Sequence, residues 1–237
     1  MTSMSTELQS PDSAKDQHVY HRRGALFIVS APSGAGKTTL CKRLMASLPG
    51  IWHSVSYTTR KPRAGEEGGR EYFFIEEPAF QEMIERREFL EYAQVYGHWY
   101  GTPRQALMDK MEQGVDVLLE IDVQGALQIK QQFDDAVCIF ILPPSLESLR
   151  IRLHGRGSDS PEEIQRRLEQ VKEEVRSFRE YQYEYQYIVR NDDLGQSLRE
   201  LQSIFVAERL KTERLDMSWF RRHFPIAQDV EHDRETP

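Results

Sequence analysis

Residues 24–50 read GALFIVSAPSGAGKTTLCKRLMASLPG, and the architecture can be read from this segment. Residues 25–29 form a continuous apolar run, which is typical of a strand buried on both faces of a parallel sheet. A leucine then recurs every four residues from Leu40 to Leu48, which predicts a helix that ends at the Pro49-Gly50 pair. The segment therefore encodes a strand, a glycine-rich turn and a helix, in that order.

The turn has the composition of a phosphate-binding loop. Its glycines let consecutive backbone N–H groups point into one cavity, and the start of the following helix adds partial positive charge. In such a loop Lys37 reaches the terminal phosphates of a nucleotide and Thr38 places its hydroxyl on Mg²⁺. The pattern G-x-x-x-x-G-K-[ST] begins here with Ala31 instead of glycine. An ordinary strand-to-helix turn is the alternative interpretation, but the strand, glycines, lysine, threonine and helix together favour a phosphate loop.

The chain beyond residue 102 continues the alternation of strands and helices. Apolar runs at residues 117–122, 137–142 and 185–189 alternate with helical patterns at residues 126–133, 146–153, 164–178 and 194–210. The third of these helices has a capping box at Ser160-Pro161-Glu162-Glu163. Strands that alternate with helices predict a parallel sheet with helical crossovers, so we expect an α/β fold.

Composition narrows the class of protein. At roughly 150 residues per domain, 237 residues correspond to one or two folding units. With 39% hydrophobic and 29% charged residues, the composition is globular, neither disordered nor membrane-like. The polar N-terminus has no apolar stretch before Gly24, so we expect no secretory signal and a cytoplasmic protein. Cys41 and Cys138 have neither metal-site nor disulfide spacing and are expected as buried thiols.

The charge balance argues against a broad nucleic-acid-binding face. Lys and Arg number 31 and Asp and Glu number 38, which leaves a net charge of −7. Proteins that bind nucleic acid through an extended basic surface usually have the opposite sign. Phosphate binding must therefore come from cations gathered locally.

Residues 51–101 have a different sequence pattern, in which short apolar runs are separated by turns that contain Gly and Pro. We interpret them as an inserted mixed α/β subdomain. Within it, Arg60 and Arg63 flank Pro62, and stiffly placed guanidinium forks suit phosphate oxygens. The hydroxyls of Tyr72 and Tyr100 are candidates for the same phosphate. Taken alone, the two arginines also fit solvated surface charges; together with the phosphate loop they suggest a second phosphate pocket.

Glu91 is a candidate for recognition of a base. Guanine presents N1–H and its 2-amino group side by side, and one carboxylate matches both donors, whereas adenine would leave the carboxylate badly paired. A surface glutamate that begins a loop explains the same residue equally well.

A glycine-hinged arginine segment follows the third strand. Arg152 and Arg156 are four residues apart, Gly155 and Gly157 surround the latter, and Arg166-Arg167 lie on the capped helix. In a phosphate-binding protein this pattern indicates a lid that closes over ATP, excludes water and stabilises the transferred phosphoryl group. A solvated basic helix end is the alternative.

Acidic side chains end the strand at residues 117–122. Glu120 and Asp122 therefore lie at the edge where α/β sheets bind ligands. Asp122 is a candidate to hold Mg²⁺ through water or to meet the acceptor. Phosphoryl transfer between phosphates demands no catalytic base, and we assign no catalytic role to His53, His98 or His154.

From about Gly24 to Leu210 the chain resembles guanylate kinases of the bacterial type. The resemblance rests on Ser30 to Lys37, Ser56-x-Thr58-Thr59-Arg60-x-Pro62-Arg63, Glu91-Tyr92-Ala93, Tyr100-Gly101-Thr102, Glu120-Ile121-Asp122-x-Gln124-Gly125, Arg156-Gly157 and Asn191-Asp192-Asp193. It implies a P-loop parallel sheet flanked by helices, an inserted mixed α/β nucleotide-monophosphate-binding subdomain and a helical lid. It also implies the transfer of a phosphoryl group from ATP to GMP, and to dGMP, with Mg²⁺.

The resemblance assigns roles to individual residues. For ATP it implies Ala31, Pro32, Ser33, Gly34, Ala35, Gly36, Lys37, Thr38, Thr39 and Asn191; for guanine Ser56, Glu91 and Thr102; for the GMP phosphate Arg60, Arg63, Tyr72 and Tyr100; and for the acceptor side Glu120 and Asp122. Lys37, Arg152, Arg156 and Arg167 are implied around the transferred phosphate. Thr38 is the expected direct ligand of Mg²⁺, and Asp122 the expected ligand through water.

The expected organisation has three parts. A leader spans residues 1–23, a kinase-like domain spans 24–210 and an extension spans 211–237. Within the domain we expect a core at residues 24–50, 103–145 and 168–210, a GMP-binding insert at 51–102 and a lid at 146–167. The expected partners are ATP and GMP, with neither nucleic acid nor membrane, in a monomer or a homo-oligomer.

Three other functions compete with this interpretation. Guanylate-kinase-like scaffold modules bind peptides, but they have typically lost the phosphate loop that Lys37 and Thr38 complete here. A kinase of a phosphorylated ribose would not need the set of Ser56, Glu91 and Thr102. A P-loop regulator or nucleic-acid-dependent ATPase is disfavoured by the acidic net charge and the acceptor pocket.

Overall fold

The computed structural model describes residues 22–63, 65–95, 97–154, 161–218, 221 and 224, without the side chains of residues 152–154, 161–164 and 167. One compact unit spans Arg23–Arg214. In the second unit, which combines the two ends of the chain, Arg22 and Leu215 form an isolated antiparallel bridge. The predicted leader, residues 1–23, lies almost entirely outside the described residues.

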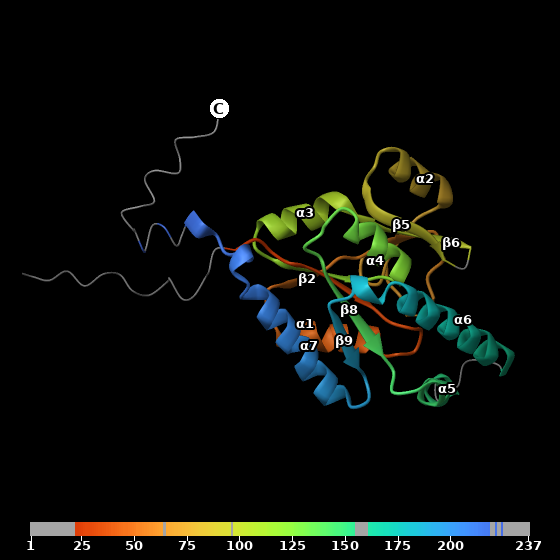
Figure 1. Cartoon of the computed structure of the whole chain (residues 1–237). Helices are drawn as coiled ribbons and strands as arrows, with labels where there is room; N and C mark the ends of the chain where they lie inside the picture. Colours follow the sequence, from red (N-terminus) through yellow and green to blue (C-terminus); the bar gives the residue numbers. More distant parts are fainter. Residues whose placement is uncertain are drawn as a thin grey trace, which may run out of the picture. The chain divides into compact units, whose positions relative to one another are not determined.

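The unit Arg23–Arg214 is built on a five-stranded parallel sheet (Figure 1). Its strands, in spatial order, are β2 (Ile51–His53), β7 (Asp116–Glu120), β1 (Leu26–Ser30), β8 (Val137–Leu142) and β9 (Tyr187–Arg190). All five residues of β1 are buried, because it is the central strand and both of its faces are covered. The prediction from the apolar run at residues 25–29, a strand buried on both faces, is therefore confirmed.

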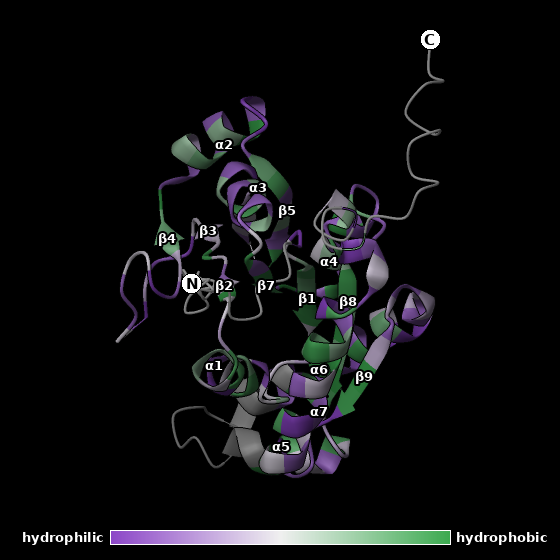
Figure 2. Ribbon diagram, turned by 90° about the vertical axis from the view of Figure 1, so that its left-hand side faces the viewer, coloured by the Kyte–Doolittle hydropathy of each residue, from purple (hydrophilic) through white to green (hydrophobic). Residues whose placement is uncertain are grey.

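Helices cover the two faces of this sheet, and alternate residues of β1 face opposite sides. Phe27 and Val29 pack in one cluster with residues of α1 (Lys37–Ser47) and α7 (Leu194–Arg209). Leu26 and Ile28 pack in the other, with residues of α3 (Arg104–Glu112), α4 (Val123–Lys130) and α6 (Pro161–Glu180). Figure 2 shows the hydrophobic colouring of β1 and β8 within this arrangement.

Stacked aromatic rings join the sheet to the helices. Phe27 stacks on Phe205 of α7 at 3.6 Å between ring centroids, and Phe140 of β8 stacks on Phe178 of α6 at 3.8 Å. The remaining elements are α5 (Leu146–His154) and the 3-10 turns η1 (Gln182–Glu184) and η2 (Thr212–Arg214). Among the described helices, none combines the length and apolar character that crossing a lipid bilayer requires.

A second, four-stranded sheet is formed between residues 57 and 103. Its spatial order is β4 (Phe73–Phe74), β3 (Tyr57–Thr58), β6 (His98–Pro103) and β5 (Phe89–Val95), and α2 (Glu77–Glu85) lies beside it (Figure 1). Phe80 of α2 stacks on Phe89 at 4.5 Å and on Trp99 at 5.9 Å. Residues 51–53, placed by the sequence in the insert, form β2 and pair with β7 of the five-stranded sheet. The division into core, insert and lid otherwise stays a prediction.

Candidate active site

The turn between β1 and α1 lines a cavity at the start of the helix. Gly34 and Gly36 have φ angles of +82° and +92°, a region that side chains with a Cβ rarely adopt. Every predicted loop residue lines one cavity of about 290 Å³, whose lining consists of Ala31, Pro32, Ser33, Gly34, Ala35, Gly36, Lys37, Thr38, Thr39, Asp122 and Glu174. A glycine-containing turn at the start of a helix is the kind of backbone that suits phosphate.

Two side chains from distant elements hold this loop. The Ser33 N–H donates to Glu174 Oε2 of α6 at 2.8 Å. Asn191 Nδ2 donates to the Ala35 carbonyl at 2.7 Å, and Asn191 is buried. A Cβ on Gly36 would lie 2.5 Å from the same Asn191 nitrogen, so Asn191 packs directly behind the loop. The described cavity lining does not include Asn191, which was predicted to contact ATP; the geometry supports a role in shaping the loop.

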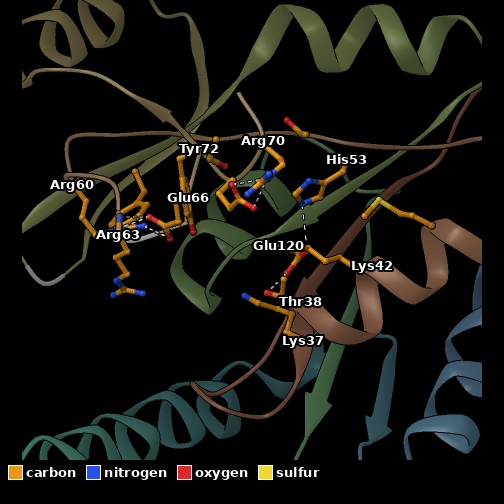
Figure 3. Close-up of a pocket in the computed structure, with 15 residues that line it drawn as sticks. Lys37, Thr38, Lys42, His53, Arg60, Arg63, Glu66, Arg70, Tyr72 and Glu120 are labelled. Carbon is orange, nitrogen blue, oxygen red and sulfur yellow. Dashed lines mark hydrogen bonds and ion pairs between the residues drawn. The ribbon is translucent and has the colours of Figure 1, made fainter. Parts of the chain in front are cut away.

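Lys37 and Thr38 connect the loop to the end of β7. Lys37 Nζ donates to the Ile121 carbonyl at 3.3 Å, and Thr38 Oγ1 donates to Glu120 Oε2 at 2.9 Å. His53 Nε2 lies 3.4 Å from Glu120 Oε1. Burial raises the pKa of Glu120, but the His53 hydrogen bond and the attraction of Lys37 outweigh it, and the pKa lies below its ordinary value. Glu120 is therefore an anion at neutral pH. Figure 3 shows its side chain between those of His53 and Thr38.

Asp122 stands at the junction of two cavities. It is the N-cap of α4, and its Oδ1 accepts a hydrogen bond from the Gly125 N–H at 2.8 Å. It lines the loop cavity and also a neighbouring cavity that contains Glu91. The cap fixes the carboxylate at the carboxyl end of β7, where parallel sheets bind ligands.

A cavity of about 470 Å³ is lined by cationic and aromatic side chains from the connection between β3 and β4 and from β6, together with residues of α1 and the end of β7. Arg60 forms two hydrogen bonds of 3.0 Å with the carboxylate of Glu66, and the Arg63 backbone N–H donates to the same carboxylate at 2.7 Å. The Arg60 guanidinium lies 5.4 Å from the ring centroid of Tyr72, which packs edge-on against Tyr100. Figure 3 shows the Arg60–Glu66 pair and the Arg63 guanidinium directed away from it. The four predicted phosphate ligands thus lie together.

A third cavity, of about 240 Å³, contains the predicted base-reading residue. It is lined by Lys37, Ser56, Arg63, Tyr72, Glu91, Ala93, Val95, Tyr100, Glu120, Ile121 and Asp122. Glu91 of β5 and Thr102 of β6 are cross-strand partners, and Thr102 Oγ1 donates to Glu91 Oε1 at 2.5 Å. Burial raises the pKa of Glu91 to about 7, although the Thr102 hydrogen bond opposes the shift. The interpretation of Glu91 as a surface loop residue was wrong, since it is 5% exposed within a strand.

Lys37 lines all three cavities. The Lys37 ammonium group would therefore lie near a phosphate bound in the loop and also near a phosphate bound beside Arg63. Such an arrangement neutralises charge on two phosphate groups that approach each other, which is the main requirement of phosphoryl transfer.

The side chains of the predicted lid arginines lie outside the part of the chain that the structure describes. Arg156 lies outside the described residues, as do the side chains of Arg152 and Arg167. The helices α5 and α6 are described, and on α5 Arg150 pairs with Glu147 at 2.8 Å. The roles of the three lid arginines stay predictions.

Among the site residues that the sequence did not predict, three acidic or imidazole side chains contact predicted ones. Glu66 organises the arginines, Glu174 contacts the loop, and His53 lies beside Glu120. Glu66 follows Arg60 by six residues in a charged turn, a weak signal, and Glu174 adjoins the apolar stripe that ends at Phe178. Cys41 and Cys138 are buried free thiols, as expected.

Comparisons with known proteins agree on one family. The family model described as guanylate kinase matches residues 23–208. A guanylate kinase of Geobacter metallireducens is 49% identical over 194 residues, which cover 82% of this chain and 94% of that relative. A guanylate kinase of Dechloromonas aromatica is 50% identical over 187 residues, which cover 79% of this chain and 91% of that relative.

A solved structure gives the same answer. The crystal structure of guanylate kinase from Anaplasma phagocytophilum matches this fold with a TM-score of 0.71 at 33% identity, covering 86% of this chain and 97% of that one. The family model spans most of the chain, and several relatives are close to half identical over nearly their full length. The chain therefore belongs to the guanylate kinase family.

Proposed function

We propose that this chain transfers the γ-phosphoryl group of ATP to the phosphate of GMP, with ADP and GDP as products. The observation that carries the proposal is the position of Lys37, which lines the phosphate-loop cavity and both cavities of the acceptor side. The acceptor is a mononucleotide because a cationic cavity with Arg60 and Arg63 adjoins a cavity with a buried carboxylate.

Guanine is the base that suits the acceptor cavity best. The Glu91 carboxylate offers acceptors for N1–H and the 2-amino group, and Thr102 fixes one of its oxygens. Ser56 lines the same cavity and supplies a hydroxyl. Adenine has an acceptor at N1, so its N1 would face the buried carboxylate with a lone pair instead of a donor, which is costly. dGMP presents the same base and is a second expected acceptor.

The residues present fit Mg²⁺. The described residues contain no cluster of three or more His, Cys, Asp or Glu side chains that would enclose a metal. Mg²⁺ in phosphoryl-transfer sites is held instead by substrate phosphates, waters and one or two protein oxygens. Thr38 would hold it directly and Asp122 through water, near the end of β7. Bound there, the ion would neutralise phosphate charge.

The residues of this chain contribute to phosphoryl transfer by positioning the two substrates. The loop N–H groups and Lys37 hold the donor phosphates, while Arg60, Arg63, Tyr72 and Tyr100 hold the acceptor phosphate. Charge on the transferred group is shared with Arg152, Arg156 and Arg167 in this proposal. No general base is needed, since the attacking oxygen already belongs to a phosphate. The substrates ATP and GMP make the cytoplasm the expected site of action.

The test is ADP release from Mg-ATP with a panel of acceptors. The panel contains GMP, dGMP, AMP, CMP, UMP and ribose 1,5-bisphosphate. The proposal expects strong turnover with GMP that falls sharply with AMP. Turnover with the ribose bisphosphate alone would replace it with a sugar-phosphate kinase, and absence of turnover with every acceptor would favour a binding module.

A further inference from the structure

Glu174 is a charged residue on the inward face of α6. Its neighbours one turn away on that face are Val171, which is fully buried, and Phe178, which is 5% exposed and stacks on Phe140 of β8. A carboxylate between such residues loses hydration, and that loss is unfavourable unless a partner replaces the water. Burial accordingly raises the pKa of Glu174.

The partner is the phosphate loop itself. Glu174 Oε2 accepts a 2.8 Å hydrogen bond from the Ser33 N–H, and the attraction of Lys37 also favours the charged form. Glu174 belongs to α6, yet it is part of the lining of the loop cavity. The negative charge of Glu174 at the edge of the phosphate-loop cavity would repel a bound phosphate. We therefore expect Glu174 to have another function that offsets this repulsion.

A second side chain, that of Asn191, also contacts the loop, and the two contacts together indicate what Glu174 does. Asn191, after β9, holds the Ala35 carbonyl, and Glu174, from α6, holds the Ser33 N–H. The loop is thus held by hydrogen bonds on both sides of Gly34, from two segments that are far apart in the chain. Backbone donors stabilise developing charge only if they are already in place when the reaction occurs.

We propose that Glu174 is a positioning residue for phosphoryl transfer, which anchors helix α6 to the phosphate-binding loop through the Ser33 N–H and so fixes the loop around the donor phosphates. The inference rests on the proposed kinase function. It predicts that kcat depends more on the side-chain oxygen that accepts the Ser33 N–H bond than on the charge of Glu174, because the anchor is a hydrogen bond from a backbone donor.

Two variants separate the bond from the charge. Glu174→Ala removes the acceptor, whereas Glu174→Gln keeps an acceptor oxygen in the same place without the charge. The matched control is Glu173→Ala, since Glu173 is the preceding residue, is 67% exposed in its side chain and pairs with Arg176 at the surface.

Steady-state kinetics give the first measurement. We expect Glu174→Ala to lower kcat by about 10- to 100-fold, the loss typical of a small misplacement of reacting groups. The KM for GMP should change less than about twofold, since the acceptor cavities do not include Glu174. Glu174→Gln should restore kcat to within about threefold of the wild type, and Glu173→Ala should match the wild type.

Hydrogen exchange of the loop amides gives a second measurement that does not depend on turnover. Exchange in residues 31–38 should be faster in Glu174→Ala than in the wild type, and unchanged in Glu173→Ala. A wild type without GMP kinase activity would overturn the proposed function, while the exchange data would still decide whether the anchor exists. If Glu174→Ala fails to fold, Glu174→Met keeps the length of the side chain and removes the acceptor.

Two results would overturn the inference. One is wild-type kcat together with wild-type loop exchange in the variant that lacks the acceptor. The other is equal loss of kcat in Glu174→Gln and Glu174→Ala, which would assign the effect to charge and not to the hydrogen bond.

Discussion

Thr102 Oγ1 donates a 2.5 Å hydrogen bond to Glu91 Oε1 across the ladder between β5 and β6. The other carboxylate oxygen faces α4, where a Cβ on Gly125 would lie only 2.9 Å from Glu91 Oε2. The carboxylate is therefore held on one side by a hydroxyl and closely approached on the other by a backbone without a side chain. This enclosure removes water from Glu91, which is why its pKa rises to about 7 despite the Thr102 bond.

The first prediction concerns the pH dependence of GMP use. Only the ionised form of Glu91 accepts both guanine donors, and its pKa is about 7. We expect kcat/KM for GMP to fall by about tenfold between pH 8 and pH 6 at saturating ATP, as one proton is taken up. The phosphate of GMP itself titrates near pH 6. Glu91→Gln is the control, because the titration of GMP affects both proteins equally. Parallel pH profiles for the two proteins would show that Glu91 does not cause the pH dependence.

The second prediction concerns stability. The folded-state pKa of Glu91, about 7, exceeds its ordinary value of 4.5, so the folded protein binds this proton more tightly than the unfolded chain. Its favourable contribution is complete below pH 4.5 and is lost as the pH rises towards 7. Glu91→Gln should therefore stabilise the protein at pH 8 by about 1–3 kcal/mol, and by much less at pH 5. Urea unfolding at both pH values measures the difference, and an equal gain at both would contradict the assignment.

The second prediction has a kinetic counterpart, because Glu91→Gln should also damage the acceptor site. An amide offers one acceptor oxygen where guanine presents two donors, so one bound donor loses its partner. We expect KM for GMP to rise by about 10- to 100-fold while KM for ATP changes less than about twofold. Kinetics with each substrate varied in turn provide the test. An unchanged KM for GMP would show that the base lies elsewhere.

The third prediction concerns Lys37, which lines all three cavities and whose Nζ contacts the Ile121 carbonyl. Lys37→Ala should lower kcat by about 10³-fold, because a preorganised charge on the transferred group is lost. The melting temperature should change by only a few degrees, since Lys37 is not part of either hydrophobic cluster. A variant with near-normal kcat and a normal fold would contradict the loop assignment.

The centre of the fold was predictable because its signals are local. The apolar run before the loop and the leucine repeat after it correspond to β1 and α1 within two or three residues. Helix α3 was missed because only Leu107 and Met111 of its nine residues are buried, too few for a visible period. Strand β5 was missed because the alternation is broken by Glu91, a carboxylate on a buried position.

The site was predictable where its residues are contiguous or carry typical chemistry. All nine predicted loop residues line one cavity, and the four predicted phosphate ligands share another. The partners that orient them were not predictable, because Glu174 is 141 residues from Ser33 in the chain. Nothing in a single sequence relates such positions until the helix α6 is packed on the sheet.

The fourth prediction concerns Glu66 as the residue that orients Arg60. Its carboxylate accepts two hydrogen bonds from that guanidinium and one from the Arg63 N–H, and its pKa is lowered mainly by the Arg60 hydrogen bond. Glu66→Ala should raise KM for GMP by about 3- to 10-fold through loss of this orientation. Glu82→Ala is the matched control, since Glu82 is exposed and pairs with Arg86, and neither residue lines the cavity. Equal effects of the two substitutions would indicate a general loss of negative charge.

The last prediction separates two reasons for glycine at position 36. A Cβ there would lie 2.5 Å from Asn191 Nδ2, which requires a shift, and the φ angle of +92° is strained for any residue with a side chain. Gly36→Ala should lower kcat/KM for ATP by at least about 100-fold through both effects. In the double variant Gly36→Ala with Asn191→Ala, the clash is absent but the backbone strain persists. Strain of about 1–2 kcal/mol corresponds to roughly 5- to 30-fold, so the double variant should lie about 5- to 30-fold below Asn191→Ala alone, a smaller loss than Gly36→Ala shows against the wild type. If the loss from Asn191→Ala to the double variant equals the loss from the wild type to Gly36→Ala, then backbone strain, and not contact with Asn191, excludes side chains from this position.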